Sequence, residues 1–190
     1  MKKGKIDNSF LEGKIQLREK FLLENNDYNV LDVFGGKGII WNRIIKRNPN
    51  LNIKITALEI EKGKNKRAIE GDNLKTLPNL DLSVYDVIDI DAYGSSFKQL
   101  QAIVKNGTFR QDVIFFTTDI FVMQGKAPNA LFNKIGITNK MIRKNPSLFT
   151  RKRDVALKHF LYTEGVRKIK VYNPTAKKNY RGFLLDNKEI

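Results

Sequence analysis

The chain has 190 residues, of which 41% are hydrophobic and 29% are charged. This length and balance suit one globular domain with a sizeable core. It contains no cysteine, which excludes disulfides, thiolate nucleophiles and cysteine-based zinc sites. No apolar run approaches the ~20 residues needed to cross a bilayer, and no hydrophobic signal segment follows the basic N-terminus. We therefore expect a cytoplasmic protein with no membrane or metal partner, and leave its oligomeric state open.

The formal charge of +15 is unevenly distributed along the chain. Residues 126–190 hold 16 Lys and Arg against 4 Asp and Glu, a net charge of +12, whereas residues 1–125 have a net charge of +3. A basic segment attached to a nearly balanced body indicates a polyanion-binding surface beside a catalytic module. A solubilising surface is the simpler alternative, and charge alone does not distinguish RNA from DNA or from an acidic membrane.

Helices and strands are predicted to alternate along the first two thirds of the chain. Amphipathic periodicity marks the helices, and short, largely apolar runs mark the strands. In chain order, the predicted elements are helix 9–24 within an N-terminal extension (1–27), strand 29–34, helix 39–47, strand 53–59, strand 68–71, strand 85–90, helix 95–105 and strand 112–117. Alternating helices and apolar strands favour a parallel sheet that is covered on both faces.

The last third of the chain, a basic C-terminal part over 137–190, has a different pattern. Its predicted elements are a helix over 151–164 and two hairpin strands, 166–172 and 180–185. A doubly wound, mostly parallel sheet that ends in an antiparallel hairpin is typical of Rossmann-like class I methyltransferases rather than of dinucleotide dehydrogenases. The sequence therefore predicts an α/β fold of this class, in a single domain over residues 1–190.

A glycine-rich turn follows the first predicted strand. Residues 30–39 read Val-Leu-Asp-Val-Phe-Gly-Gly-Lys-Gly-Ile, which predicts a strand, a sharp turn and the start of a helix. Glycine is needed where the backbone turns sharply and approaches a ligand closely, because a Cβ atom would clash. By itself, such a turn is also consistent with a simple connection between a strand and a helix.

Acidic residues lie at or next to the ends of three successive predicted strands, at Asp32, Glu59 and Asp72. A carboxylate at the end of the second strand is placed to accept hydrogen bonds from ribose hydroxyls. Each acid alone is consistent with a solvated loop, but the three in this order indicate an S-adenosylmethionine site. Asp32 would face the amino acid part of the cofactor, and Asp72 its adenine amino group. The predicted cofactor-binding residues are Asp32, Phe34, Gly36, Gly38, Glu59, Asp72 and Asn73.

The fourth predicted strand ends in a candidate catalytic loop, Asp-Ile-Asp-Ala-Tyr-Gly-Ser over residues 89–95. Methyl transfer to an exocyclic amine needs a group that aligns the amine and accepts its proton, and a surface that holds the ring. Asp91 can do the first, and Tyr93 can stack on an extruded base. We predict Asp91 and Tyr93 as catalytic residues. The simpler alternative is an acidic strand end followed by a helix cap at Ser95.

This loop resembles the Asp-x-Asp-Pro-aromatic-Gly-Ser loop of the tRNA guanine-N2 dimethyltransferases. The downstream residues Thr118-Asp119, Gly125-Lys126-Ala127-Pro128 and Lys134-Ile135-Gly136 are similar to that family's Thr-Asp…Gly…Pro…Lys-x-Gly segment. The resemblance covers about residues 29–136. It implies S-adenosylmethionine-dependent methylation of guanine N2 in tRNA or other structured RNA. Ala92 stands where the family has proline, and the chain is shorter than is usual for that family.

The basic C-terminal part mixes cations with aromatic residues (Phe149, Phe160 and Tyr162), as nucleic-acid surfaces do. An amphipathic helix with a solvated face would give a similar pattern. The predicted nucleic-acid contacts are Lys126, Arg151, Lys152, Arg153 and Lys158. The alternatives to RNA methylation are a DNA or protein methyltransferase, and an inactive nucleic-acid-binding protein on a methyltransferase scaffold.

Overall fold

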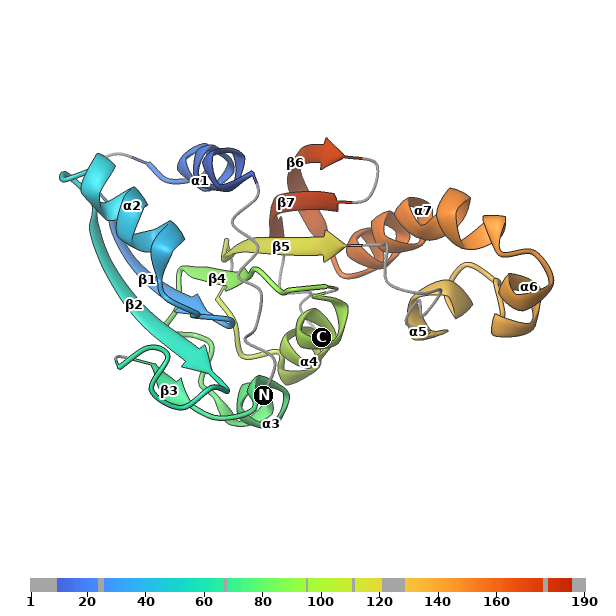
Figure 1. Cartoon of the computed structure of the whole chain (residues 1–190), viewed down its shortest axis with the longest axis horizontal. Helices are drawn as coiled ribbons and strands as arrows, with labels where there is room; N and C mark the ends of the chain where they lie inside the picture. Colours follow the sequence, from blue (N-terminus) through green and yellow to red (C-terminus); the bar gives the residue numbers. More distant parts are fainter. Residues whose placement is uncertain are drawn as a thin grey trace.

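The computed structural model describes residues 10–23, 26–66, 68–94, 96–110, 112–120, 129–175 and 178–185. A twisted sheet runs through this part of the chain, with helices on both of its faces (Figure 1). Its elements are α1 (Leu11–Glu19), β1 (Asp27–Asp32), α2 (Ile39–Arg47), β2 (Asn52–Glu59), β3 (Ile69–Glu70), α3 (Asn73–Thr76), the 3-10 helix η1 (Leu77–Asn79), β4 (Val87–Ile90), α4 (Phe97–Asn106), β5 (Ile114–Ile120), α5 (Asn129–Asn133), α6 (Asn139–Lys144), α7 (Ser147–Thr163), β6 (Val166–Thr175) and β7 (Lys178–Leu185).

The sheet has seven strands in the order β3-β2-β1-β4-β5-β7-β6. The first five strands are parallel, and β7 lies antiparallel to both β5 and β6. The predicted α/β class, with a mostly parallel sheet and a C-terminal antiparallel hairpin, is confirmed. The strand order reverses between β1 and β4, so the chain leaves these neighbouring strands in different directions. Ligands of open α/β sheets bind at the carboxyl ends of strands at such a point.

The sheet separates two hydrophobic clusters. Side chains alternate between the two faces of a strand, so Val87 packs with α1 and α2, and the adjacent Ile88 packs with α4 and α7. Asp89 follows with the same orientation as Val87. Its side chain therefore points to the face that α1 and α2 cover. Every residue of β4 is buried, so this carboxylate lies inside the fold.

Helix α1 holds the buried carboxylate of Asp89. Arg18 donates from Nε and Nη2 to the two oxygens of Asp89, at 2.8 and 2.7 Å. Trp41 of α2 donates from Nε1 to Asp89 at 2.8 Å, and the Arg18 guanidinium lies 5.1 Å from the ring centroid of Phe116 on β5. The exposed fractions of the Arg18 and Asp89 side chains are 3% and 1%. These contacts fix α1 against the centre of the sheet.

Several predicted boundaries differ from the structure. The first helix ends five residues before its predicted end, at Glu19, and α7 begins four residues early, at Ser147. The fifth strand begins after Asp112, whose φ of 66° places it in a left-handed turn conformation, and it continues to Ile120. The short elements α3, η1, α5 and α6 were not predicted, because a segment of three to six residues does not establish a helical period.

We expect the Arg18→Met substitution to lower the free energy of unfolding by about 3–5 kcal/mol, because it leaves the Asp89 carboxylate buried with no cation. Urea denaturation measures this change. The matched control is Arg47→Met, which breaks the exposed pair between Arg47 of α2 and Glu12 of α1, where both side chains are more than 40% exposed. That change should cost far less, because solvent screens an exposed ion pair and its contribution to stability is small. Equal losses in the two variants would contradict an anchoring role for Arg18.

Candidate functional site

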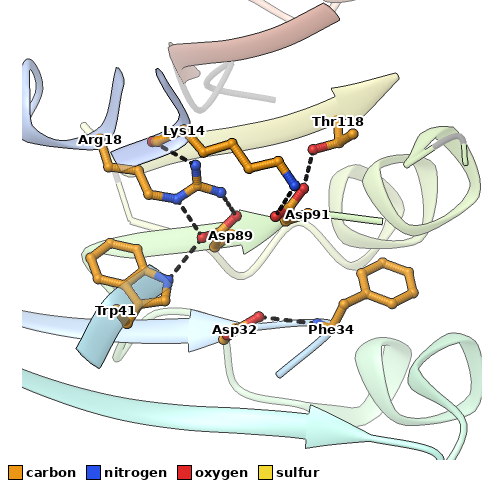
Figure 2. Close-up of polar contacts among 8 residues, drawn as sticks. All are labelled: Lys14, Arg18, Asp32, Phe34, Trp41, Asp89, Asp91 and Thr118. Atoms are coloured by element: carbon orange, nitrogen blue, oxygen red, sulfur yellow. Dashed lines mark hydrogen bonds and ion pairs between the residues drawn. The ribbon is translucent and has the colours of Figure 1, made fainter. Parts of the chain in front are cut away.

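Three carboxyl groups meet where β1 and β4 end. Asp32 is the last residue of β1 and is the register partner of Asp89 on the parallel strand β4. Residues paired in this way point to the same face of a sheet, and Asp91, two residues beyond Asp89, follows the same alternation. Figure 2 shows the three carboxyl groups together, with the cations of α1 directed at Asp89 and Asp91. The structure thus brings the predicted residues Asp32 and Asp91 to one place, around Asp89, which was not predicted as a site residue.

Asp91 accepts one contact on each of its oxygens. Lys14 of α1 lies 2.9 Å from Oδ2, and the hydroxyl group of Thr118 on β5 donates to Oδ1. The side chains of Lys14 and Asp91 are 8% and 13% exposed. The ammonium group of Lys14 also lies 4.9 Å from the ring centroid of Tyr180. Asp91 is therefore held between helix α1 and the C-terminal half of the sheet.

Lys14 and Arg18 were not predicted as site residues. They are four residues apart on α1, about 6 Å along a helix, and their partners Asp91 and Asp89 are two residues apart along β4, about 6.6 Å along a strand. These two spacings match, so two cations on one side of a helix can meet two acids on one side of a strand. The available signal was the position of both cations within the apolar stripe of the predicted helix.

Burial and nearby like charges raise the pKa of Asp32. Its side chain accepts a hydrogen bond from the backbone N–H of Phe34 at 3.2 Å, and it has no ion-pair partner among the described residues. Burial, followed by the neighbouring Asp89, raises the pKa of Asp32 well above its ordinary value. Burial also raises the pKa of Asp89, and Arg18 opposes this rise. Burial alone would lower the pKa of Arg18, but the neighbouring carboxyl groups, Asp89 foremost, outweigh this effect and raise it.

The glycine-rich turn takes the predicted conformation. Gly36 and Gly38 have φ angles of +47° and +67°, in the left-handed region that favours glycine. Gly35, which was not predicted as a site residue, has a packing role. A Cβ atom at Gly35 would lie 2.6 Å from the Cβ of Ala57 on β2, and its N–H donates to the carbonyl of Leu58 at 2.9 Å. Glycine at this position lets the turn lie directly against the neighbouring strand, next to the half-buried Phe34.

Glu59 ends β2, as predicted, and only 8% of it is exposed. Its Oε1 atom accepts the backbone N–H of Glu61 at 3.0 Å, and Lys64 lies 3.6 Å from Oε2. These local contacts hold the carboxylate at the end of the strand. Lys64 comes from the Lys-rich connection that precedes β3, and this connection contains no helix among its described residues.

Asp72 and Asn73 follow β3 and begin α3. Asp72 is the N-cap, and its Oδ1 atom accepts the backbone N–H of Leu74 at 2.9 Å, the usual contact of an acidic N-cap. Asn73 reaches back to the glycine-rich turn and donates from Nδ2 to the carbonyl of Val33 at 3.1 Å. Gln99 of α4, another residue that was not predicted, donates to Asn73 Oδ1 at 3.2 Å. Asn73 thus joins the third strand end to the first.

The candidate catalytic loop begins with a tight turn. The backbone N–H of Ala92 donates to the carbonyl of Ile90 at 2.9 Å, a three-residue turn. Proline has no N–H group, so the proline of the resembling family could not form this bond. Tyr93 is 65% exposed, and Gly94 has a φ of +124° with no atom within 4 Å of an added Cβ. An exposed aromatic ring therefore lies two residues after the largely buried carboxylate of Asp91.

The predicted nucleic-acid residues fall mainly on α7. Arg151, Lys152 and Lys158 are exposed, and Tyr162 is 79% exposed. The aromatic assignment of Phe160 was wrong, because this ring faces the core. It is 2% exposed and lies 5.0 Å from the ring of Phe97. Lys126 and the side chains of Arg153 and Phe149 lie outside the described part of the chain.

Helix α7 lies near the candidate catalytic loop. Phe97, which contacts Phe160 of α7, is the first residue of α4, the helix that follows this loop. In Figure 1, α5, α6 and α7 lie beyond the arrowhead of β5. Because β4 and β5 are parallel, this is also the end of the sheet that carries Asp91. The exposed cations of α7 therefore belong to a helix that packs beside the candidate catalytic loop.

Two features are absent from the described residues. No group of three His, Asp or Glu side chains there is arranged to hold a metal ion. None of the helices in the described ranges is long and apolar enough to cross a membrane.

No family profile and no curated protein matches this sequence. Solved structures match its fold. A proposed class I S-adenosylmethionine-dependent methyltransferase from Listeria monocytogenes is 13% identical, with a TM-score of 0.56 over 100% of this chain and 65% of its own. A proposed caffeoyl-CoA O-methyltransferase from Staphylococcus aureus is 16% identical, with a TM-score of 0.52 over 95% and 85% of the two chains. The S-adenosylhomocysteine-bound methyltransferase PaMTH1 from Podospora anserina is 12% identical, with a TM-score of 0.51 over 93% and 77%.

The chain has the class I methyltransferase fold. At these identities the likeness concerns the fold, and it indicates where on the fold a ligand would bind. In a class I methyltransferase fold, the carboxyl ends of the parallel strands are the ligand-binding edge. Asp32, Glu59, Asp72 and Asp91 all lie along that edge in this chain. The site described above therefore lies where this fold places its ligands.

The raised pKa of Asp32 predicts a pH-dependent stability. In the unfolded chain this carboxyl has its ordinary pKa of 3.8, so the folded state binds the proton more tightly. The stabilisation from the bound proton is full below the unfolded pKa and is lost as the pH rises through the folded pKa. Asp32→Asn should therefore raise the free energy of unfolding at pH 8 and change it little at pH 4. Each tenfold difference in proton affinity corresponds to about 1.4 kcal/mol.

Urea denaturation of the ligand-free protein at several pH values measures this effect. Asp81 provides a control of opposite sign, because hydrogen bonds from Ser83 lower its pKa. Asp81→Asn should therefore lower stability at neutral pH and not raise it. A loss of stability in Asp32→Asn at pH 8 would contradict the assignment of Asp32 as a buried carboxyl that resists ionisation.

Proposed function

We propose that this protein is an S-adenosylmethionine-dependent N-methyltransferase that acts on nucleic acid, most specifically on guanine N2 in tRNA or other structured RNA. The observation that carries the proposal is the juxtaposition of Asp91 and Tyr93. A largely buried carboxylate directly follows the central strand β4, and a 65% exposed aromatic ring lies two residues further on. Such a pair suits an amine attached to a flat ring. We also propose that the chain works as a single domain in the cytoplasm.

The residues at the strand ends fit the proposed cofactor. S-adenosylmethionine carries an ammonium group, and Asp32 is the carboxyl of the central three that lacks an ion pair within the described residues. Gly36 and Gly38 let the backbone approach a ligand closely. Glu59 would accept hydrogen bonds from ribose hydroxyls. Asp72 and Asn73 would hold the adenine edge, next to the glycine-rich turn that Asn73 contacts.

Methyl transfer requires the chain to align an amine and to receive a proton. When bound, S-adenosylmethionine would supply a methyl group activated by its positive sulfur. Asp91 would accept one N–H of the incoming amine and thereby direct the nitrogen lone pair at the methyl carbon. The nitrogen would form its bond to the methyl carbon as that carbon's bond to sulfur breaks, and the proton that the nitrogen then releases would pass to Asp91 or to water. Tyr93 would hold the ring by stacking, worth about 1–3 kcal/mol per base.

The positive charge of the C-terminal part supports the proposal that the substrate is a polyanion. The segment over 126–190 has a net charge of +12, and Arg151, Lys152 and Lys158 are exposed on α7. Through Phe160 and Phe97, α7 packs beside the loop that carries Tyr93. A phosphate backbone bound along α7 would lie near the proposed acceptor site.

We expect Asp91→Ala to lower single-turnover methyl transfer by about 100-fold or more, because a positioned proton acceptor is typically worth that much. Affinity for the cofactor should change much less. Tyr93→Ala should act mainly by raising the substrate concentration that transfer requires, and should reduce turnover less completely than Asp91→Ala. The assay uses labelled S-adenosylmethionine with bulk tRNA, rRNA or DNA, followed by nucleoside analysis, and calorimetry measures cofactor binding. Near-normal transfer by Asp91→Ala would refute the catalytic assignment, and a labelled product other than N2-methylguanosine would refute the proposed target.

The affinity for RNA should fall steeply as salt concentration rises, because bound cations release counterions condensed on the phosphates. Replacing Arg151, Lys152 and Lys158 with Ala should lower affinity and reduce the slope of log affinity against log salt by about 2–3. The matched control replaces three exposed cations of the nearly balanced body, Arg43, Lys46 and Lys54. Equal effects of the two triple substitutions would show that α7 has no special role in binding.

A further inference from the structure

We propose that Lys14 is a positioning residue that makes the acceptor site selective for an uncharged amine, such as that of a nucleobase, over an aliphatic ammonium. This inference rests on the proposed function and narrows its substrate class. Lys14 lies 2.9 Å from Asp91 and contacts the same carboxylate that would align the incoming amine. As Figure 2 shows, Lys14 comes from α1, whereas Asp91 and Thr118 come from the sheet.

Lys14 is held in place on several sides. Its side chain is 8% exposed, and its ammonium group lies 4.9 Å from the ring centroid of Tyr180, within the range of a cation–π interaction. Arg18, anchored on Asp89, donates from Nη1 to the backbone carbonyl of Lys14 at 2.9 Å. Lys14 is therefore part of the buried structure around Asp91 and not a surface lysine that reaches the carboxylate by chance.

The contacts already made by Asp91 favour a neutral N–H donor as its further partner. An ionised carboxylate offers about four lone-pair positions, and the structure shows two of them used, by Lys14 and Thr118. The remaining positions can accept the N–H of a neutral amine. An ammonium group would instead bring a second cation to a carboxylate that Lys14 already neutralises, beside the positive sulfur of the cofactor. Repulsion among three positive charges in a largely buried site would oppose its binding.

The charge on sulfur provides a test that needs no knowledge of the methyl acceptor. S-adenosylmethionine has a positive sulfur, and S-adenosylhomocysteine has a neutral one. Calorimetry on both ligands gives the ratio of their dissociation constants. Lys14→Met removes the cation but keeps the apolar stem, so Asp91 becomes an uncompensated negative charge. The preference for S-adenosylmethionine should then rise at least about fivefold. Lys14→Arg keeps the charge and should leave the ratio near the wild-type value.

Asp91→Asn supplies the complementary variant if Lys14→Met does not fold. It leaves the Lys14 cation without its partner, so the preference for S-adenosylmethionine should fall. A merely structural role for Lys14 would weaken the two ligands equally and leave the ratio unchanged. The exposed cation Arg47 again gives the control, since Arg47→Met should leave the ratio at its wild-type value.

A transfer assay compares bulk tRNA with poly-L-lysine as methyl acceptors. We expect the wild-type protein to transfer to the RNA and not to poly-L-lysine, and Lys14→Met to lose at least about tenfold in transfer to RNA. An unchanged ligand ratio in folded Lys14→Met and Asp91→Asn, or methylation of poly-L-lysine by the wild-type protein, would overturn the inference while cofactor binding stands. A folded wild-type protein that binds neither ligand would instead overturn the proposed function, and the inference with it.

Discussion

The structure depends on a match between two cations of α1 and two acids of β4. Asp89 is buried inside the fold, where an uncompensated charge costs several kcal/mol. Arg18 and Trp41 supply three donors to its two oxygens, so the charge is both paired and hydrogen-bonded. Lys14 lies four residues before Arg18 and meets Asp91 in the same way. Helix α1, predicted as part of an N-terminal extension, is therefore an integral wall of the site.

This match also assigns different roles to three neighbouring acids. Three adjacent ionised carboxylates would repel one another strongly, and two cations from α1 neutralise two of them. Asp89 serves to anchor α1 through Arg18. Asp91 is an oriented hydrogen-bond acceptor whose negative charge is balanced by Lys14. Asp32 has no ion pair within the described residues, and burial together with the neighbouring Asp89 raises its pKa well above the ordinary value. A positively charged ligand would stabilise its ionised form, so binding such a ligand and ionising Asp32 should be coupled.

The features that the sequence predicted depend on local patterns. Apolar runs and their spacing indicated the parallel strands. Asp32, Glu59 and Asp72 were predicted as site residues because they lie at the ends of those strands, where ligands of such sheets bind. The pairing of Lys14 with Asp91 joins residues 77 positions apart, and no local pattern encodes the angle at which α1 crosses β4. The orientation of Phe160 was missed for a related reason. An aromatic residue among cations on a helix fits either face until the neighbours of that helix are known.

The sequence resemblance rests on residues that meet in one contact of the structure. Its two main segments, the loop from Asp89 and the Thr118-Asp119 pair, are separated in sequence, yet the Thr118 hydroxyl group donates to Asp91. The backbone N–H of Ser96 also donates to the carbonyl of Thr118, at 3.2 Å. The threonine therefore fixes both the carboxylate and the far end of the loop. Ala92 departs from the family pattern at the near end, where its N–H bond to Ile90 replaces the rigidity of a proline ring. The departure changes how the loop is held and leaves Asp91 at the end of β4, so the test of a shared substrate lies with Tyr93 and the ring that it would hold.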